Sequence, residues 1–285
     1  MVEIDNMLKD NYSSKDKWIE RMKRDREIAY KKLKKKSLAI GNDMNELAKA
    51  LEIQTRFEMY SVGNCILIQD QMPEAVYCRE YNKWINDGYI VKRRDKSIII
   101  LEPSEPDYKD DGTRVVYYNP KRVYDVSATN ALPPNKSYDY SPKTVLIGLL
   151  KSSPLKIEST ENVGHNNKCA FYDKEKNIMY VCKGKSVEAT IQDLTTELAK
   201  YLLDKEETSK KETNQFKATC ISYMFCNKFG IPFPNEEFKK LTNELKGTDK
   251  EIRDELTNIK DTYSVIKANM VVVLEKSNKS KEQVR

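Results

Sequence analysis

The sequence is poor in glycine and proline, with nine and ten residues respectively among 285. That scarcity argues against low-complexity disorder and favours long helices. Apolar runs are short, and the best examples are 145–150 and 270–274, whereas a helix needs about 20 apolar residues to cross a bilayer. The first ten residues include acidic side chains and lack the apolar stretch of a secretory signal. These absences predict a cytoplasmic protein with no membrane segment.

Residues that build metal sites are equally scarce. There is a single histidine, His165, and the six cysteines form no CxxC pair, so a structural zinc knuckle is not expected. Several cysteines lie in apolar runs, which favours reduced and buried thiols. The spacing from His165 to Cys169 gives half of a metal site, and a nucleophilic Cys–His pair would depend on the same lone histidine without an orienting group. No cofactor is expected.

The net charge of +6 is unevenly distributed. Residues 1–36 hold twelve basic and seven acidic side chains, and residues 77–97 hold six and three. A concentrated positive balance indicates a polyanionic partner such as a nucleic acid. A solvated helix face is the alternative, especially for the N-terminal segment.

The hydrophobic pattern predicts an α+β fold. An N-terminal domain of helices with a small sheet is followed by a domain with a hairpin and two core helices. Expected in the first half are a charged helix or partly disordered arm over 15–36, a helix capped by Asn42 or Asp43, short helices near 65–68 and 79–86, and two pairs of strands within 89–102 and 113–129, the second broken at Asn119 and Pro120. Expected in the second half are helices at 143–151, 187–204, 212–229 and 248–276, a strand at 155–159 and a hairpin turning at 173–176.

The stretch DLTTELAKYLL, residues 193–203, looks like the metal-binding helix H-E-x-x-H of a zinc peptidase with both histidines replaced. Thr196 and Lys200 are four residues apart and project from one face of the helix. A neutral threonine hydroxyl is a poor zinc ligand, and a protonated lysine cannot ligate. Taken alone, this helix and the apolar helix after it indicate an ordinary packed pair.

Several short motifs occur in order between residues 60 and 129. They are Tyr60-Ser61, Asn64, Leu67-Ile68, Gln71, Pro73, Trp84, Gly88, Val91-Lys92, the apolar run 98–101 with Pro103, and 123–127. In this order and spacing the segment resembles the N-terminal, single-stranded-DNA-binding domain of the ArdC antirestriction family, which LtrC-like proteins of conjugative elements share. The family pattern has glycines where this chain has Arg94 and Ser97, so the geometry of the basic turn is expected to differ.

Residues 170–231 resemble the zincin-like domain of the same family through FYDKEKNIMYV, LTTELAKYL and YMFCNKFGI. The resemblance places Thr196 and Lys200 on the two histidine positions, Thr219 on a third ligand that is glutamate in the family, and Glu197 on the general base. A base without a metal-bound water has no evident chemistry, so no enzymatic activity is expected. Glu197 is instead expected to pair with Lys200 one turn later.

The resemblance divides the chain into five parts. They are a basic helical or flexible arm at 1–36, an ArdC-N-like domain at 37–130, a linker at 131–142, a zincin-like domain without metal ligands at 143–246, and a C-terminal helix and tail at 247–285.

Aromatic and basic side chains gather in the first domain in a way that suits unpaired DNA. Aromatic rings stack on exposed bases, and cationic groups contact phosphates. The predicted nucleic-acid-binding residues are Tyr60, Asn64, Tyr77, Tyr81, Trp84, Lys92, Arg93, Arg94 and Lys96. For Trp84 the core is the favoured alternative, and for Asn64 it is a bond to backbone.

The sequence therefore predicts a single-stranded-DNA-binding accessory protein of a plasmid or conjugative transposon, which protects transferred DNA. The zincin-like domain would serve as a scaffold or a surface for a protein partner. A peptidase with unanticipated ligands and a protein adaptor without nucleic-acid binding are the alternatives. DNA and RNA are not distinguished by the sequence.

Overall fold

The computed structural model describes residues 2–134, 140–161, 168–205 and 214–282. The chain forms two compact units. The first contains Met1–Ala39 and Met59–Pro134, and the second contains Ile40–Glu58 and Asn135–Arg285. Each unit combines helices with a three-stranded sheet, which confirms the predicted α+β class. None of the described helices is both long enough and apolar enough to cross a membrane.

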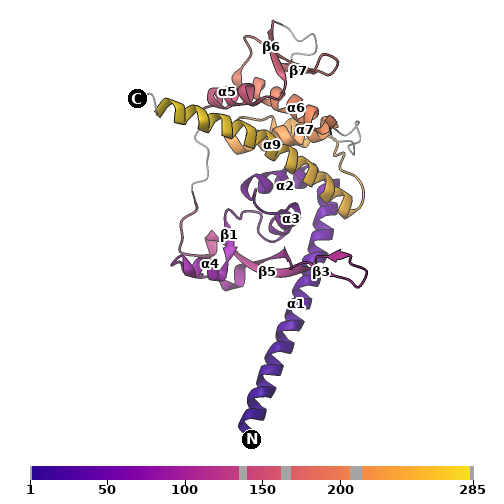
Figure 1. Ribbon diagram of the computed structural model, residues 1–285, viewed down its shortest axis with the longest axis vertical. Coiled ribbons are helices and arrows are strands. Elements are labelled where there is room, and N and C mark those ends of the chain that lie inside the picture. Colours follow the sequence, from indigo (N-terminus) through magenta and orange to yellow (C-terminus); the bar gives the residue numbers. More distant parts are fainter. Residues whose placement is uncertain (1, 135–139, 162–167, 206–213, 283–285) are drawn as a thin grey trace. The chain divides into compact units, whose positions relative to one another are not determined.

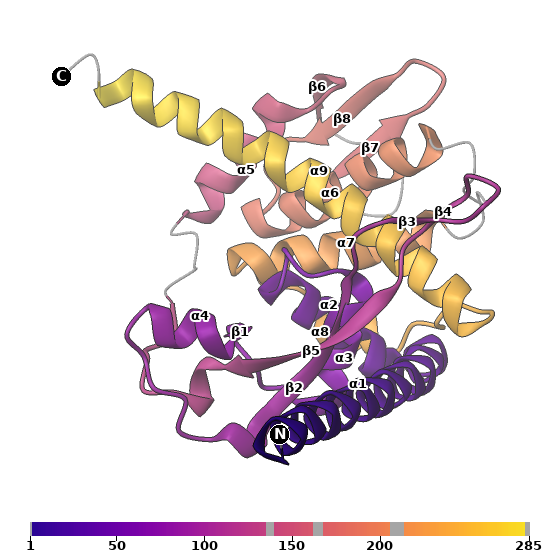
Figure 2. The same ribbon diagram turned by 60° about the horizontal axis from the view of Figure 1, so that its bottom comes forward.

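The first unit is built on an antiparallel sheet in the order β1-β5-β2. Its elements are α1 (Val2–Asn42, in this unit to Ala39), α3 (Val62–Gln71), β1 (Cys78–Glu80), α4 (Tyr81–Asn86), β2 (Ser97–Pro103), β3 (Asp107–Tyr108), β4 (Arg114–Val115) and β5 (Tyr118–Asp125). The helix α1 passes beside β5 in both views (Figures 1 and 2), where buried Asp25 accepts hydrogen bonds from Arg122 at 2.9 Å. The predicted arm is therefore one continuous helix.

Two side-chain amides of α3 bind the outer edge of β2. Asn64 accepts from the Leu101 N–H and donates to its carbonyl, both at 2.9 Å. Gln71 does the same for Ile99, at 3.0 and 2.9 Å. The two amides are seven residues apart, which is about two helical turns, so they lie on the same face of α3. The two strand residues are two apart, so their backbone groups point to the same edge of β2. A helix thus satisfies backbone groups that another strand would otherwise have to bind.

Two strand predictions were wrong. The segment before the basic turn contains only an isolated bridge from Val91 to Thr129, and Arg94–Lys96 forms a single 3₁₀ turn. The predicted break at Asn119 and Pro120 is also absent, because β5 runs through both residues. Proline is tolerated there because β1 pairs only with residues 123–125, so Pro120 has a neighbouring strand on one side alone.

Asp125, at the end of β5, holds the segment that leads into β1. Its buried carboxylate accepts from the N–H groups of Val76, Tyr77 and Ser127 at 2.7 to 2.9 Å. Burial by itself raises the pKa of Asp125, but these hydrogen bonds outweigh it and the pKa lies below its usual range. The ionised Asp125 carboxylate thus fixes the backbone at Val76 and Tyr77, next to the aromatic residues of this unit.

The second unit contains the sheet β6-β8-β7, in which β6 is parallel and β7 antiparallel to β8. Its elements are α2 (Met44–Arg56), α5 (Pro142–Ser152), β6 (Lys156–Thr160), β7 (Ala170–Asp173), β8 (Ile178–Cys182), α6 (Val187–Lys205), α7 (Asn214–Phe229), α8 (Asn235–Lys239) and α9 (Asp249–Glu282). The sequence predicted all of these except α8. Asp43 caps α2 by accepting from the Asn45 N–H, as predicted.

The helices α5, α6, α7 and α9 form the core of the second unit, and Figure 1 shows α9 lying along the others. At Gly148 a Cβ atom would lie 2.7 Å from Met270, so only glycine permits the close approach of α5 and α9. Residue Glu58 joins the end of α2 to α7 and α9 through Lys228, Tyr263 and Lys267, at 2.7 to 3.2 Å. All six cysteines are buried thiols, as predicted.

We expect Asn64→Ala and Gln71→Ala each to lower the free energy of unfolding by about 1–3 kcal/mol, because each leaves a buried N–H and a buried carbonyl of β2 without a partner. Urea unfolding followed by circular dichroism measures the change. The exposed Asn82→Ala in α4 is the matched control and should stay within about 0.5 kcal/mol. Losses as small as the control's would show that these amides do not hold α3 to the sheet.

Acid should weaken the fold through Asp125. Because the folded-state pKa is lowered, its contribution is complete above the unfolded pKa of about 3.9 and disappears as pH falls through the folded value. The gap in unfolding free energy between the wild type and Asp125→Asn should therefore be widest near pH 7 and shrink below about pH 4. A gap of constant size from pH 7 to pH 3, measured by urea unfolding, would contradict this assignment.

Candidate functional site

The first unit gathers five aromatic residues around α4. Trp84 is buried, and its indole N–H donates to the Tyr124 carbonyl at 3.0 Å. Tyr77 and Tyr89 meet its ring edge-on, with centroids 5.7 and 5.8 Å away, and Tyr81 lies 6.1 Å from Tyr124. We call Tyr77, Tyr81, Trp84, Tyr89 and Tyr124 the aromatic cluster. Trp84 lies inside it, so its ring faces are covered by protein.

The basic turn, residues 92–96, lies directly against this cluster. The Arg94 guanidinium stands over the Tyr81 ring at 4.8 Å and donates to the Tyr81 hydroxyl. Lys92, Arg93 and Lys96 are exposed, and Arg93 is paired with Asp95 at 2.9 Å. The backbone of the turn is fixed because the Lys92 N–H donates to the Ala128 carbonyl at 2.8 Å. The structure thus places the predicted Arg94 on the predicted Tyr81, and the other three predicted basic residues lie in the same exposed turn as Arg94.

Exposed apolar side chains border the basic turn, and the sequence analysis missed them. Ile85 lies in the last turn of α4 and is 41% exposed, and Ile90 is 60% exposed and two residues before Lys92. Tyr89 lies between them and is 39% exposed. Ile85 lay in a predicted helix and Ile90 in a predicted strand, so neither gave a signal of exposure, and the absence of that strand leaves Ile90 at the surface.

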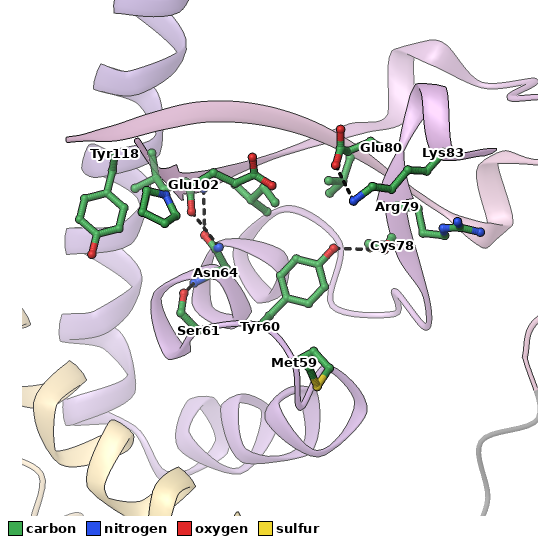
Figure 3. Close-up of a pocket in the computed structure, with 14 residues that line it drawn as sticks. Met59, Tyr60, Ser61, Asn64, Cys78, Arg79, Glu80, Lys83, Glu102 and Tyr118 are labelled. Carbon is green, nitrogen blue, oxygen red and sulfur yellow. Dashed lines mark hydrogen bonds and ion pairs between the residues drawn. The ribbon is translucent and has the colours of Figure 1, made fainter. Parts of the chain in front are cut away.

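Tyr60 and Asn64 lie in a different place. Both line a pocket of about 740 Å³ beside the start of α3 (Figure 3). The Tyr60 hydroxyl donates to the Cys78 carbonyl at 3.1 Å, and burial raises the pKa of Tyr60. The amide of Asn64 is engaged with Leu101, so its position favours a positioning role over direct contact with a base.

In the second unit, Glu197 on α6 is a buried carboxylate held by two lysines. Lys200 donates to it at 2.8 Å, which confirms the predicted pair, and Lys168 donates at 3.1 Å. The N–H of Tyr172 on β7 contacts the other oxygen at 3.3 Å. The carboxylate that the resemblance places on a general base is thus neutralised by ammonium groups.

The other positions that the resemblance places on metal ligands carry groups that suit a metal poorly. Thr196 and Thr219 each donate their hydroxyl to a carbonyl of their own helix, at Gln192 and Gln215, at 2.8 and 2.9 Å. Lys200 brings a positive charge to the position of a ligand. In the part of the chain that the structure describes, no group of three or more His, Cys, Asp or Glu side chains could hold a metal ion.

The sequence half-site around Cys169 gains no support. His165 lies outside the described residues. Burial, and then the nearby Asp193 carboxylate, raise the pKa of the Cys169 thiol, which disfavours the nucleophilic thiolate.

No family model matches the chain, and no curated protein matches it. Among solved structures, the metal-free crystal structure of the antirestriction protein ArdC from plasmid R388 matches with a TM-score of 0.51. The match covers 74% of this chain and 85% of that chain, at 14% identity. This chain has the fold of ArdC. The Mn(II)-bound structure of ArdC matches 74% of this chain and 89% of that chain at 13% identity, with a TM-score of 0.49. The resemblance inferred from sequence is confirmed at the level of fold.

Removal of both lysines around Glu197 should destabilise the protein more than removal of the carboxylate. Lys168→Met with Lys200→Met leaves a buried charge unpaired, which costs about 3–5 kcal/mol. Glu197→Gln leaves two lysines whose side chains are 38% and 21% exposed and can reach water, so its cost should be smaller. The triple variant should recover much of the loss of the double variant. Urea unfolding of the three variants tests this order, and equal losses would contradict it.

Proposed function

We propose that this protein is a single-stranded-DNA-binding accessory protein of a mobile genetic element. The observation that carries the proposal is the exposed basic turn packed against the aromatic cluster in the first unit. Lys92, Arg93, Arg94 and Lys96 supply the positive charge, and Tyr81 and Tyr89 supply partly exposed rings. Phosphate contacts would provide most of the affinity, and base stacking about 1–3 kcal/mol per ring.

Unpaired strands suit this surface better than a duplex. Tyr89, Ile85 and Ile90 present apolar area beside the charges, and a base can reach such area with its flat face only when it is not stacked inside a helix. Trp84 and Tyr77 hold the cluster together through edge-on contacts and act as positioning residues in this proposal. The binding is sequence-nonspecific where phosphates and ring faces are the only contacts.

The element in which the protein works and its role are inferred from the fold. ArdC of plasmid R388 is an antirestriction protein and has the same fold at 14% identity. We place the present protein in the same setting, where it would protect transferred DNA. The second unit would serve as a scaffold or a surface for a protein partner, since Thr196, Lys200 and Thr219 offer no ligand set and Glu197 is bound by lysines.

Fluorescence anisotropy with a labelled oligonucleotide, as single strand and as duplex, tests this function. We expect tighter binding of the single strand and a linear fall of log K with log salt of about −0.7 per neutralised phosphate. Lys92→Gln with Lys96→Gln should reduce that slope by about 1.4 if both contact phosphates. The control is Lys151→Gln with Lys185→Gln, which removes the same charge from exposed positions of the second unit.

If the control variant weakens binding as much as the test variant, the basic turn contributes only general electrostatic attraction. Absence of binding at low salt would contradict the proposal and favour a protein adaptor.

A further inference from the structure

The pocket beside α3 is separate from the basic turn and has its own chemistry. It lies within the first unit and is lined by the segment before α3, the β1–α4 junction and the ends of β2 and β5. Its volume of about 740 Å³ falls within the range of about 300–1,000 Å³ typical of ligand sites. Ile100, Leu101 and Val123 give it apolar lining, so a flat apolar group can be accommodated.

Two tyrosine rings line this pocket. Tyr60 is half-buried, and its hydroxyl is anchored to the Cys78 carbonyl, which fixes the ring. Tyr118 is 46% exposed and lies at the opposite end from Arg79 and Lys83 (Figure 3). Met59 is 96% exposed beside Tyr60 and supplies an adaptable thioether. These side chains suit a planar aromatic ligand.

Two carboxylates also line the pocket, and both are ion-paired. Glu80 is bound through one oxygen, Oε1, by Lys83 at 2.8 Å and Lys121 at 2.9 Å. Glu102 is bound through Oε2 by Lys121 at 2.7 Å. Each of these ion pairs uses a single carboxylate oxygen, so the pocket offers acceptors to a ligand that carries N–H donors.

Positive charge lies at one end of the pocket. The Lys83 side chain is 61% exposed, and Arg79 lies beside it, paired with Asp87. A phosphate at this end would meet both cations while the attached base lies toward the tyrosines. The pocket thus combines ring faces, hydrogen-bond acceptors and cations, which are the counterparts of the ring, the N–H groups and the phosphate of a nucleotide.

We infer that the pocket receives one nucleobase of the bound strand and favours a base with an exocyclic amino group, guanine foremost, over thymine. Guanine presents an imino and an amino donor on one edge, which a single carboxylate can accept together, and cytosine and adenine present one amino group. Thymine has no amino group. The inference rests on the proposed function, because the strand that the basic turn holds would deliver the base.

Fluorescence anisotropy at fixed salt tests the inference. It compares the affinity for a 15-residue oligothymidylate with the affinity for the same strand carrying one central guanine. We expect the guanine to tighten binding about tenfold in the wild type. Glu102→Gln should abolish that preference, so that the two strands bind with equal affinity, while the exposed Glu105→Gln, outside the pocket, should keep it. Tyr118→Ala should weaken binding of the guanine-containing strand by about tenfold or more, because the ring face on which the base stacks is lost.

The outcomes separate this inference from the proposed function. If the wild type binds both strands equally, and Tyr118→Ala binds like the wild type, the pocket takes no base although the protein binds DNA. If Glu102→Gln strengthens the binding of both oligonucleotides by the same factor, the Glu102 carboxylate acts only through its charge. The inferred preference for bases with an amino group is then wrong. If the wild type binds neither strand, the proposed function itself fails. Circular dichroism of each variant confirms that it is folded.

Discussion

The backbone edge of β2 and the two amides that cover it hold the first unit together. Asn64 and Gln71 each use a donor and an acceptor on one strand residue, so α3 is fixed in both position and rotation. The start of α3 then places Tyr60 beside Cys78 and forms one wall of the pocket. A loose α3 would open that pocket, because its other walls come from the sheet and from α4. A motif that resembles part of a binding domain is thus also the means by which the domain is assembled.

Asp125 has the corresponding role for the aromatic cluster. It holds the chain at Val76 and Tyr77 and also at Ser127, on the two sides of Trp84 and its neighbours. Three backbone donors stabilise its charge more than burial disfavours it. The rings of Tyr77 and Trp84 are therefore positioned by an ionic group and not by apolar packing alone.

The second unit shows how a buried carboxylate on α6 is accommodated. A buried carboxylate needs a counter-charge, because an isolated charge in the interior is costly. Lys168 and Lys200 supply that charge to Glu197, and the hydroxyls of Thr196 and Thr219 are satisfied within their own helices. These polar groups of the helix pair α6 and α7 are thus satisfied by neighbouring protein groups.

The sequence by itself determined most of the helices (though not α8), the hairpin of the second unit, the cap of α2, the charged regions and the unsuitability of Thr196, Lys200 and Thr219 as ligands, because these follow from local spacing and side-chain chemistry. It also indicated the pair Glu197–Lys200, which spans one helical turn. Tertiary structure alone decided that Pro120 lies inside a strand, that Ile90 is exposed, that Lys168 joins Glu197, and that Tyr60 and Tyr118 share a pocket. Each of these features depends on which segment, distant in sequence, packs against the residue. The hydrogen bonds and the burial that decide it come from residues far apart in the chain.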